Sequence, residues 1–296
     1  MKPSIAMIAS SVADIIINIE KLPHTQQDCN IQNQQISLGG CGYNVAHAVS
    51  LFDVPYLLCT SIGTGIYGEF VSKMLHEEAV PLLFPRHEQE NGCCYCFVEA
   101  SGERTFVAHR GAEYHFKEQW FVHLDQLPID TVYLCGLDLE EEDTRRYVFS
   151  YLSRHPHITV YFAPGPRLSH LPAQVFQELC SYHCILHLSE IEALSLSGAS
   201  SVDEAAIALY SMTKQAVIIT LGEQGSLCYE QGFIRSEAIP TKVINTIGAG
   251  DAHIGSIIAC RSLGYDWKTA LTKANEVSSQ VVGVQGSTLP KDQFHR

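Results

Sequence analysis

The chain has no uninterrupted run of about 18 apolar residues, the length that a membrane-spanning helix requires. It is also short of positive charge, because its 296 residues contain 19 lysines and arginines against 32 aspartates and glutamates. The net charge of −13 argues against nucleic acid or an anionic membrane as a partner, since both carry negative charge. It does not exclude a phosphorylated ligand, because exposed charges are screened beyond about 8 Å and local backbone amides dominate.

Strong metal-site motifs are missing as well. The 14 histidines form no H-E-x-x-H group, and the 11 cysteines are odd in number. Cys93 and Cys96 have a C-x-x-C spacing, but no second pair follows at zinc-finger spacing, so metal binding is the weaker interpretation. Reduced cysteines pack as small hydrophobes, and we therefore expect a cytoplasmic chain with thiols in its core.

Most of the sequence alternates short apolar runs with amphipathic stretches. The expected strands are 4–10, 55–61, 131–136, 159–162, 184–187 and 216–221. The expected helices are 43–52, 66–78, 142–153, 173–182 and 202–213. This alternation predicts an α/β fold, with a mostly parallel sheet covered by helices on both faces. We expect one domain over residues 1–296, with ligands bound beyond the carboxyl ends of the strands.

Two stretches, about 12–37 and 92–110, break the alternation. They contain strand-like runs without an intervening helix, and the second turns at Ala100-Ser101-Gly102-Glu103. Strands inserted into an α/β chain tend to pair into a small separate sheet. We expect a lid over the edge of the main sheet that shields a reaction from water, with a hairpin extension as the alternative.

The segment Asn245-Thr246-Ile247-Gly248-Ala249-Gly250-Asp251 directly precedes an apolar helical run. Small residues allow a phosphate to approach the backbone, and the helix start offers unpaired N–H groups and the positive end of its dipole. A carboxylate there would repel an anion unless it takes a proton from a hydroxyl. Asp251 is therefore predicted to be a general base beside an anion-binding loop.

A second glycine cluster, Gly39-Gly40-Cys41-Gly42-Tyr43-Asn44, also opens a helix. Its glycines permit a tight turn and close approach of a ligand, and Asn44 can donate and accept hydrogen bonds to hydroxyl groups. A helix-capping role for Asn44 is the alternative.

Taken in chain order, these segments and several others resemble the ribokinase-like (PfkB) family of carbohydrate and nucleoside kinases over nearly the whole chain. The matching positions are Asp14, Gly39-Gly40 with Asn44, Gly102-Glu103-Arg104-Thr105, Thr220 through Gly225, Thr246 through Asp251, and Asn275. The resemblance implies a ribokinase-like three-layer α/β/α sandwich. It also implies ATP-dependent phosphoryl transfer to a primary hydroxyl, with Mg²⁺ bridging the phosphates.

The resemblance assigns a role to each matching position. Asp251 would deprotonate the acceptor, while the amides of Gly248, Ala249 and Gly250 stabilise the moving phosphoryl group. The residues that would bind the acceptor are Asp14, Gly39, Gly40, Asn44 and Arg104, although a surface role for Arg104 is equally open. The residues that would contact the nucleotide are Thr220, Gly222, Gly225, Thr246 and Asn275. Glu192 would serve the metal, with a solvated helix face as the alternative.

Departures from the family pattern refine these expectations. Asn245 replaces the aspartate that usually starts the second signature, which argues against activation by a monovalent cation such as K⁺. Ser189 replaces the asparagine of the Asn-x-x-Glu motif, and Cys41 replaces a lysine found in ribokinases proper. The Val243-Ile244-Asn245 run and the form of the first signature resemble pseudouridine kinases, which favours a nucleoside acceptor.

The expected partner is thus a small sugar or nucleoside, and the resemblance also allows a homodimer formed through the lid. A different class of function stays open. A non-catalytic sugar- or nucleoside-binding protein could have kept the fold after losing part of the metal motif.

Overall fold

The computed structural model describes residues 3–80, 82–101 and 103–295. Its larger sheet has eight strands in the order β12-β11-β10-β9-β8-β7-β1-β4 within these residues. The six parallel strands are β1 (Ile5–Ile8), β4 (Tyr56–Cys59), β7 (Thr131–Cys135), β8 (Thr159–Ala163), β9 (Ile185–Ser189) and β10 (Val217–Thr220). Two antiparallel strands, β11 (Ser226–Tyr229) and β12 (Phe233–Ser236), complete one edge.

Helices cover both faces of this sheet. One face carries α1 (Cys41–Ser50), α2 (Gly65–Glu77), α8 (Ala249–Ser262) and α9 (Trp267–Val282). The other face carries α3 (Glu118–Leu124), α4 (Glu142–Arg154), α5 (Ala173–Ser181), α6 (Glu190–Ser197) and α7 (Val202–Thr213). Short 3₁₀ turns lie at Ala112–Tyr114, Gly165–His170, Gly222–Gln224 and Lys291–Gln293.

The period-two alternation of each strand divides the core between the two faces. In β1, Ile5 and Met7 belong to the apolar cluster under α1 and α8, whereas Ala6 and Ile8 belong to the cluster under α3 and α4. Both faces are therefore buried, as a parallel sheet requires. The predicted three-layer α/β/α sandwich is confirmed.

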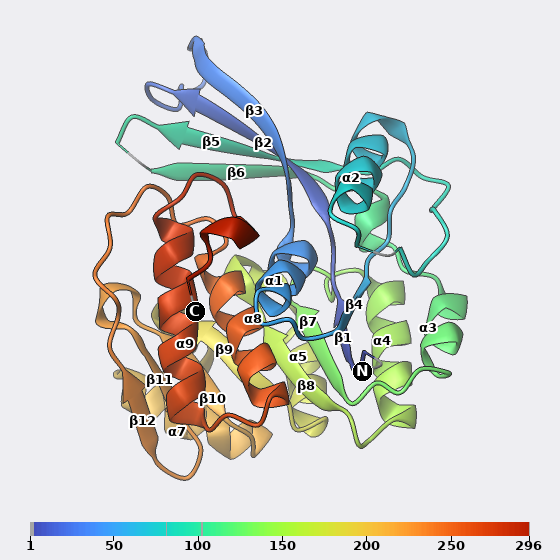
Figure 1. Cartoon of the computed structure of the whole chain (residues 1–296), viewed down its shortest axis with the longest axis vertical. Coiled ribbons are helices and arrows are strands. Elements are labelled where there is room, and N and C mark those ends of the chain that lie inside the picture. Colours follow the sequence, from blue (N-terminus) through green and yellow to red (C-terminus); the bar gives the residue numbers. More distant parts are fainter. Residues whose placement is uncertain (1–2, 81, 102, 296) are drawn as a thin grey trace.

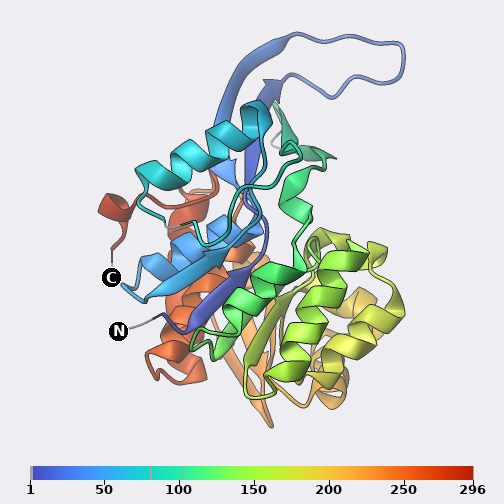
Figure 2. The same ribbon diagram turned by 90° about the vertical axis from the view of Figure 1, so that its right-hand side faces the viewer.

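A second sheet has the order β3-β2-β5-β6 in the described part of the chain. Its strands are β2 (Val12–Ile19), β3 (Ile31–Gly39), β5 (Cys93–Glu99) and β6 (Arg104–His109). Figure 1 shows this sheet above α1, α8 and α9, and Figure 2 shows β2 and β3 extending away from the main body. Gly102 of the predicted turn lies outside the described residues.

The chain passes from the main sheet to the small sheet directly after β1. β1 ends at Ile8, and Asp14 lies in β2 of the small sheet, within the stretch of about 12–37 that broke the strand–helix alternation. The backbone N–H of Ser10 donates to Asp138 Oδ1 (3.0 Å), and that of Ser11 donates to Thr60 Oγ1 (2.9 Å). These side chains replace the ladder partners of β1, and so the chain leaves one sheet and enters the other.

No helix in residues 3–80, 82–101 or 103–295 is both long and apolar enough to cross a membrane.

Candidate active site

Asp251 lies in the first turn of α8, whose N-cap is Gly248. Gly248 adopts φ = 76°, and a Cβ there would lie 2.0 Å from the carbonyl oxygen of Ser287, so only glycine fits. At Gly250, by contrast, an added Cβ would meet nothing within 4 Å. The conformation of the helix start thus requires Gly248, whereas Gly250 leaves open space in front of the loop.

The amides of this loop are mostly unused by the fold. Within the described chain, the N–H groups of Gly248, Gly250 and Asp251 have no hydrogen-bond partner, while Ala249 N–H lies 3.4 Å from the carbonyl oxygen of Thr246. Free amides at a helix start, together with the open space at Gly250, form a cradle for an anionic oxygen. The role of Gly248, Ala249 and Gly250 in holding a phosphoryl group stays a prediction, and the structure adds the amide of Asp251, which is freer than that of Ala249.

Asp251 is held by neutral groups. Asn44 Nδ2, from α1, donates to Asp251 Oδ2 (2.9 Å), and Ser287 Oγ donates to Asn44 Oδ1 (3.0 Å). Asn44 and Ser287 are both buried, with 5% and 6% of their surface exposed. Residues 207 positions apart in sequence thus meet here, and the bond from Ser287 fixes which end of the Asn44 amide faces the carboxylate.

Burial raises the pKa of Asp251 to about 6, while hydrogen bonds from Asn44 and Cys41 oppose that rise. In the described part of the chain no lysine, arginine or histidine forms an ion pair with Asp251. A half-buried carboxylate with a pKa of about 6 and no cationic partner among the described residues is ionised at neutral pH and suited to accept a proton.

Asp14 lies near Asp251 and against the first glycine cluster. It is 8% exposed, and burial together with the negative charge of Asp251 raises its pKa to about 7. A Cβ on Gly39 would lie 1.9 Å from Asp14 Oδ2, so the backbone packs directly on this carboxylate. Gly40 has φ = 89° and a Cβ there would lie 2.7 Å from the carbonyl oxygen of Ser10, so the turn into α1 requires glycine.

Arg104 spans from the small sheet to the loop before α8. Its Nη1 donates to Thr246 Oγ1 (2.7 Å), across 142 residues of sequence. Its Nε is buried and has no hydrogen-bond partner in the part of the chain that the structure describes. The guanidinium therefore contacts the loop before α8, and its Nε donor is unused within the described residues; contact with the acceptor stays a prediction.

The predicted nucleotide residues fall into two groups. Thr220 ends β10, and Gly222 and Gly225 form the turn to β11, with φ values of 58° and 92°. Asn275 lies apart from them, buried on α9. Its Oδ1 accepts hydrogen bonds from Ser226 Oγ (3.0 Å) and pairs with His253 Nε2 (3.1 Å).

The other end of the Asn275 amide is also used, because Nδ2 donates to the carbonyl oxygens of Ser236 (3.1 Å) and Glu237 (3.0 Å). These bonds join α9 to the edge of the main sheet. A structural role explains the side chain fully, and contact with adenine stays a prediction.

Glu192 has a structural partner that the sequence analysis did not anticipate. Its carboxylate accepts from the backbone N–H of Ser189 (2.8 Å), and Ser189 Oγ accepts from the N–H of Glu192 (3.3 Å). This reciprocal pair is a capping box at the start of α6. It replaces the solvated helix face as the structural alternative to a role with the metal.

Asn245 is likewise committed to the fold. Its Oδ1 accepts from the N–H of Ile247 (2.8 Å), and its Nδ2 donates to the carbonyl oxygen of Val284. The side chain shapes the loop before α8.

Two residues of the site were not predicted. Ser287 lies in a loop without a motif, and only its contact with Asn44 identifies it. Asp138 follows β7 and is 1% exposed; burial raises its pKa to about 7, and its Oδ2 has no partner within the described residues. The only sequence signal for Asp138 was its place just after a predicted strand, at the start of an acidic stretch that continues through Asp143.

Comparisons with known proteins identify the family of the chain. The profile of the pfkB family of carbohydrate kinases matches residues 2–293. YegV, an uncharacterized sugar kinase from Escherichia coli K12, is 27% identical over 292 residues, which cover 96% of this chain and 90% of YegV.

Two solved structures share the fold. The nucleoside kinase from Burkholderia thailandensis, in complex with inosine, has a TM-score of 0.80 at 20% identity, covering 96% of this chain and 92% of its own. The ribokinase from Arabidopsis thaliana, complexed with ribose and ATP, has a TM-score of 0.79 at 21% identity, covering 99% and 97%. The chain belongs to the pfkB family of carbohydrate kinases, and it is a phosphotransferase with an alcohol group as acceptor.

Proposed function

We propose that this chain transfers the γ-phosphoryl group of ATP to a primary hydroxyl of a sugar or nucleoside, with Asp251 as the general base. The observation that carries the proposal is the pairing of this carboxylate with unused amides at the start of α8. Solved relatives of the same fold bind ribose with ATP, and inosine.

The proposed reaction needs one proton acceptor and one anion site. Asp251 takes the proton of the acceptor hydroxyl while the hydroxyl oxygen forms a bond to the γ-phosphorus. The bond between that phosphorus and the oxygen of the departing ADP breaks. The amides of Gly248, Gly250 and Asp251, with that of Ala249, hold the oxygens of the moving group. General-base help contributes roughly 10²–10⁴-fold, or about 3–5 kcal/mol of the barrier. Positioning and charge stabilisation supply most of the rest.

The acceptor is proposed to lie between the two sheets. Asp14 and Asn44, with the backbone of Gly39 and Gly40, would bind its hydroxyl groups. Arg104 would approach from the lid, where its unpartnered Nε can meet a phosphate or hydroxyl oxygen. Such charge-assisted bonds are stronger than neutral ones.

The nucleotide is proposed to lie along Thr220, Gly222, Gly225 and Thr246. Mg²⁺, when bound with ATP, neutralises charge on the phosphates. Glu192 has one carboxylate oxygen engaged in the capping box, and its other oxygen would be available to help hold Mg²⁺. K⁺ activation is not proposed, because Asn245 is committed to the loop.

Pseudouridine is the acceptor we favour within this class. This preference rests on the Gly-Gly-x-Gly-x-Asn-x-Ala form of residues 39–46 and on Val243-Ile244-Asn245, both of which resemble pseudouridine kinases. A homodimer formed through the small sheet is likewise a proposal that follows from the family.

The test is release of ADP from Mg-ATP across a panel that contains pseudouridine, inosine, D-ribose and other pentoses. We expect turnover with at least one member and the highest kcat/KM with pseudouridine. Turnover with a pentose alone would refute the nucleoside preference and leave the kinase assignment intact. Binding of a sugar or nucleoside that ignores ATP, without turnover, would establish the non-catalytic alternative.

A further inference from the structure

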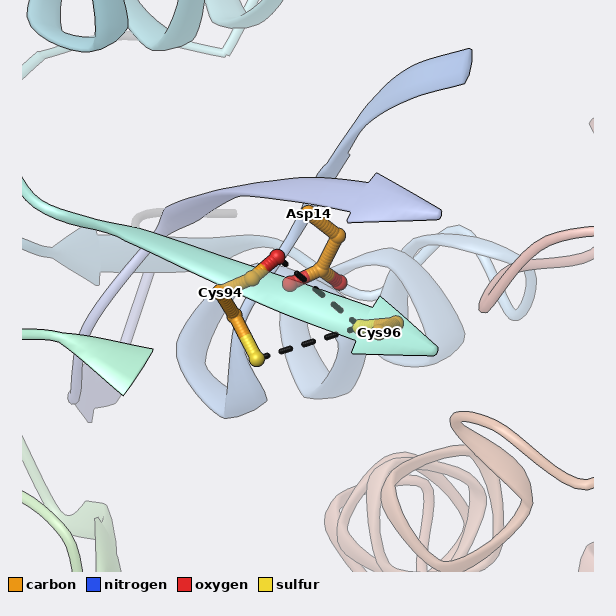
Figure 3. A group of neighbouring side chains, drawn as sticks. All are labelled: Asp14, Cys94 and Cys96. Carbon is orange, nitrogen blue, oxygen red and sulfur yellow. Dashed lines mark hydrogen bonds between the residues drawn. The ribbon is translucent and has the colours of Figure 1, made fainter. Parts of the chain in front are cut away.

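Asp14, Cys94 and Cys96 converge on one face of the small sheet. β2 and β5 are parallel neighbours, and their register pairs Asp14 with Cys94. Cys96 lies two residues further along β5, so its side chain emerges on the same face as that of Cys94. Figure 3 shows Asp14 projecting from β2 toward the two cysteines of β5.

The ligand atoms of this group are close together, and one distance among them matches a zinc site. In residues 3–80, 82–101 and 103–295, it is the one group of three or more histidine, cysteine, aspartate or glutamate residues whose ligand atoms all lie within 4.8 Å. The Sγ atoms of Cys94 and Cys96 are 3.8 Å apart. Tetrahedral zinc with Zn–S bonds of about 2.3 Å has an S···S edge of about 3.8 Å, so the two sulfurs already have the required separation.

The chemistry of the three ligands selects the kind of ion. Two thiolates and one carboxylate favour a soft or borderline divalent ion such as Zn²⁺ over Mg²⁺, which prefers oxygen ligands. Cys96 is 1% exposed and Asp14 8%, whereas Cys94 is half-buried and gives an ion access. The three ligands carry three negative charges, which Zn²⁺ and the guanidinium of Arg104 on the neighbouring strand β6 balance.

The backbone also holds the ligands in place. Asp14 is fixed between β2 and the backbone of Gly39, and the two cysteines are fixed by the ladder that joins β5 to both β2 and β6. Two ligands from one strand and one from its neighbour are therefore positioned before any ion arrives. Such preorganisation lowers the cost of binding.

We propose that Asp14, Cys94 and Cys96 bind one Zn²⁺ ion through three protein ligands and leave its fourth position open. The C-x-x-C spacing of Cys93 and Cys96 is not the pair involved, because register places Cys93 on the opposite face of β5. A bound ion would occupy the Asp14 carboxylate and so exclude the acceptor. The exclusion of the acceptor rests on the proposed function, in which Asp14 binds the acceptor.

The test measures zinc binding to the reduced, metal-free protein by equilibrium dialysis. Co²⁺ serves as a spectroscopic probe of thiolate ligation. The variants are Cys94→Ser, Cys96→Ser and Asp14→Asn, and Cys29→Ser is the matched control because Cys29 is an exposed thiol in the loop between β2 and β3. Circular dichroism and the melting temperature of each variant report its folding. Cys94→Ser is the variant that leaves the buried core unchanged.

We expect one equivalent of zinc in the wild-type protein and in Cys29→Ser, with a near-ultraviolet sulfur-to-cobalt band. Affinity should fall at least about 100-fold in Cys94→Ser and Cys96→Ser, since even outer contacts of zinc ligands contribute 10–100-fold. Equal zinc binding in the wild-type protein and in folded Cys94→Ser would overturn the site, as would the lack of any cobalt–thiolate band.

Competition with the acceptor separates the two proposals. With an acceptor found in the ADP-release panel, zinc should raise the acceptor KM of the wild-type protein and of Cys29→Ser, and not that of Cys94→Ser. An unchanged KM in zinc-loaded wild-type protein would leave the metal site standing and refute the placement of the acceptor on Asp14.

Discussion

Replacing Asn44 with alanine should shift the pH dependence of the reaction upward. Asn44 Nδ2 donates to Asp251 Oδ2 (2.9 Å), and this bond opposes the effect of burial, so that the pKa of the carboxyl rises only to about 6. A hydrogen bond to a charged group contributes about 1.5–3 kcal/mol. At 1.36 kcal/mol per unit, removing it should raise the pKa of Asp251 by about 1–2 units. Proton acceptance requires the ionised form, so the acid limb of kcat/KM moves to higher pH.

The assay is the pH profile of kcat/KM between pH 5 and 9, because this ratio reports groups of the free enzyme. Ser287→Ala should give a smaller shift in the same direction, since it removes the bond that orients the Asn44 amide. Ser256→Ala is the matched control, because its buried hydroxyl bonds only to the carbonyl of Ala252 on the same helix. Loss of an acceptor contact alone would lower kcat/KM equally at all pH values. An acid limb that stays in place in Asn44→Ala would refute the reasoning.

Three further predictions concern neighbouring groups. Arg104→Ala should lower kcat about 10–100-fold, as expected for a lost charge-assisted bond, whereas Thr246→Val should lower it less in the same steady-state assay. Equal losses would mean that Arg104 only joins the small sheet to the loop before α8. Asp138→Asn should stabilise the protein at pH 8.5 by up to about 4 kcal/mol and should have little effect at pH 4. The folded protein holds the Asp138 proton up to a pKa of about 7, whereas the unfolded chain releases it near 3.8, so the wild-type protein loses stability as the pH rises between these values and asparagine avoids that loss. Denaturant unfolding at the two pH values measures the difference, and a difference independent of pH would contradict the prediction. Glu192→Gln should keep the capping box and the stability of the protein, but it should raise the Mg²⁺ concentration that gives half the maximal rate. Ser189→Ala should instead lower the free energy of unfolding by about 1 kcal/mol. An unchanged Mg²⁺ dependence in Glu192→Gln would limit that residue to capping.

The layered fold was predictable because strand and helix periods differ. Apolar runs such as 131–136 and 216–221 correspond to β7 and β10, and the amphipathic stretch 142–153 corresponds to α4. The edge hairpin of β11 and β12 was not predicted, since its strands carry polar side chains at Ser226, Arg235 and Ser236 that interrupt the apolar runs. Polar and charged side chains are common on strands at the edge of a sheet.

The candidate site divides in the same way. Asp251, Asn44 and the glycines were predictable because a small-residue loop at a helix start limits the chemistry that it can support. The contacts from Ser287 to Asn44 and from Arg104 to Thr246 join residues 243 and 142 positions apart, and no local pattern encodes such pairs. The capping box of Glu192 also needed coordinates, because a serine followed by a glutamate three residues later is compatible with either role.

The measurement that tests the central assignment most directly is turnover by Asp251→Asn. An asparagine at this position can still accept the bond from Asn44 Nδ2, so the fold and acceptor binding should be preserved. Without a proton acceptor, kcat should fall at least about 100-fold, by the usual contribution of general-base catalysis. A folded Asp251→Asn protein that binds its acceptor and keeps a kcat near that of the wild type would contradict the account.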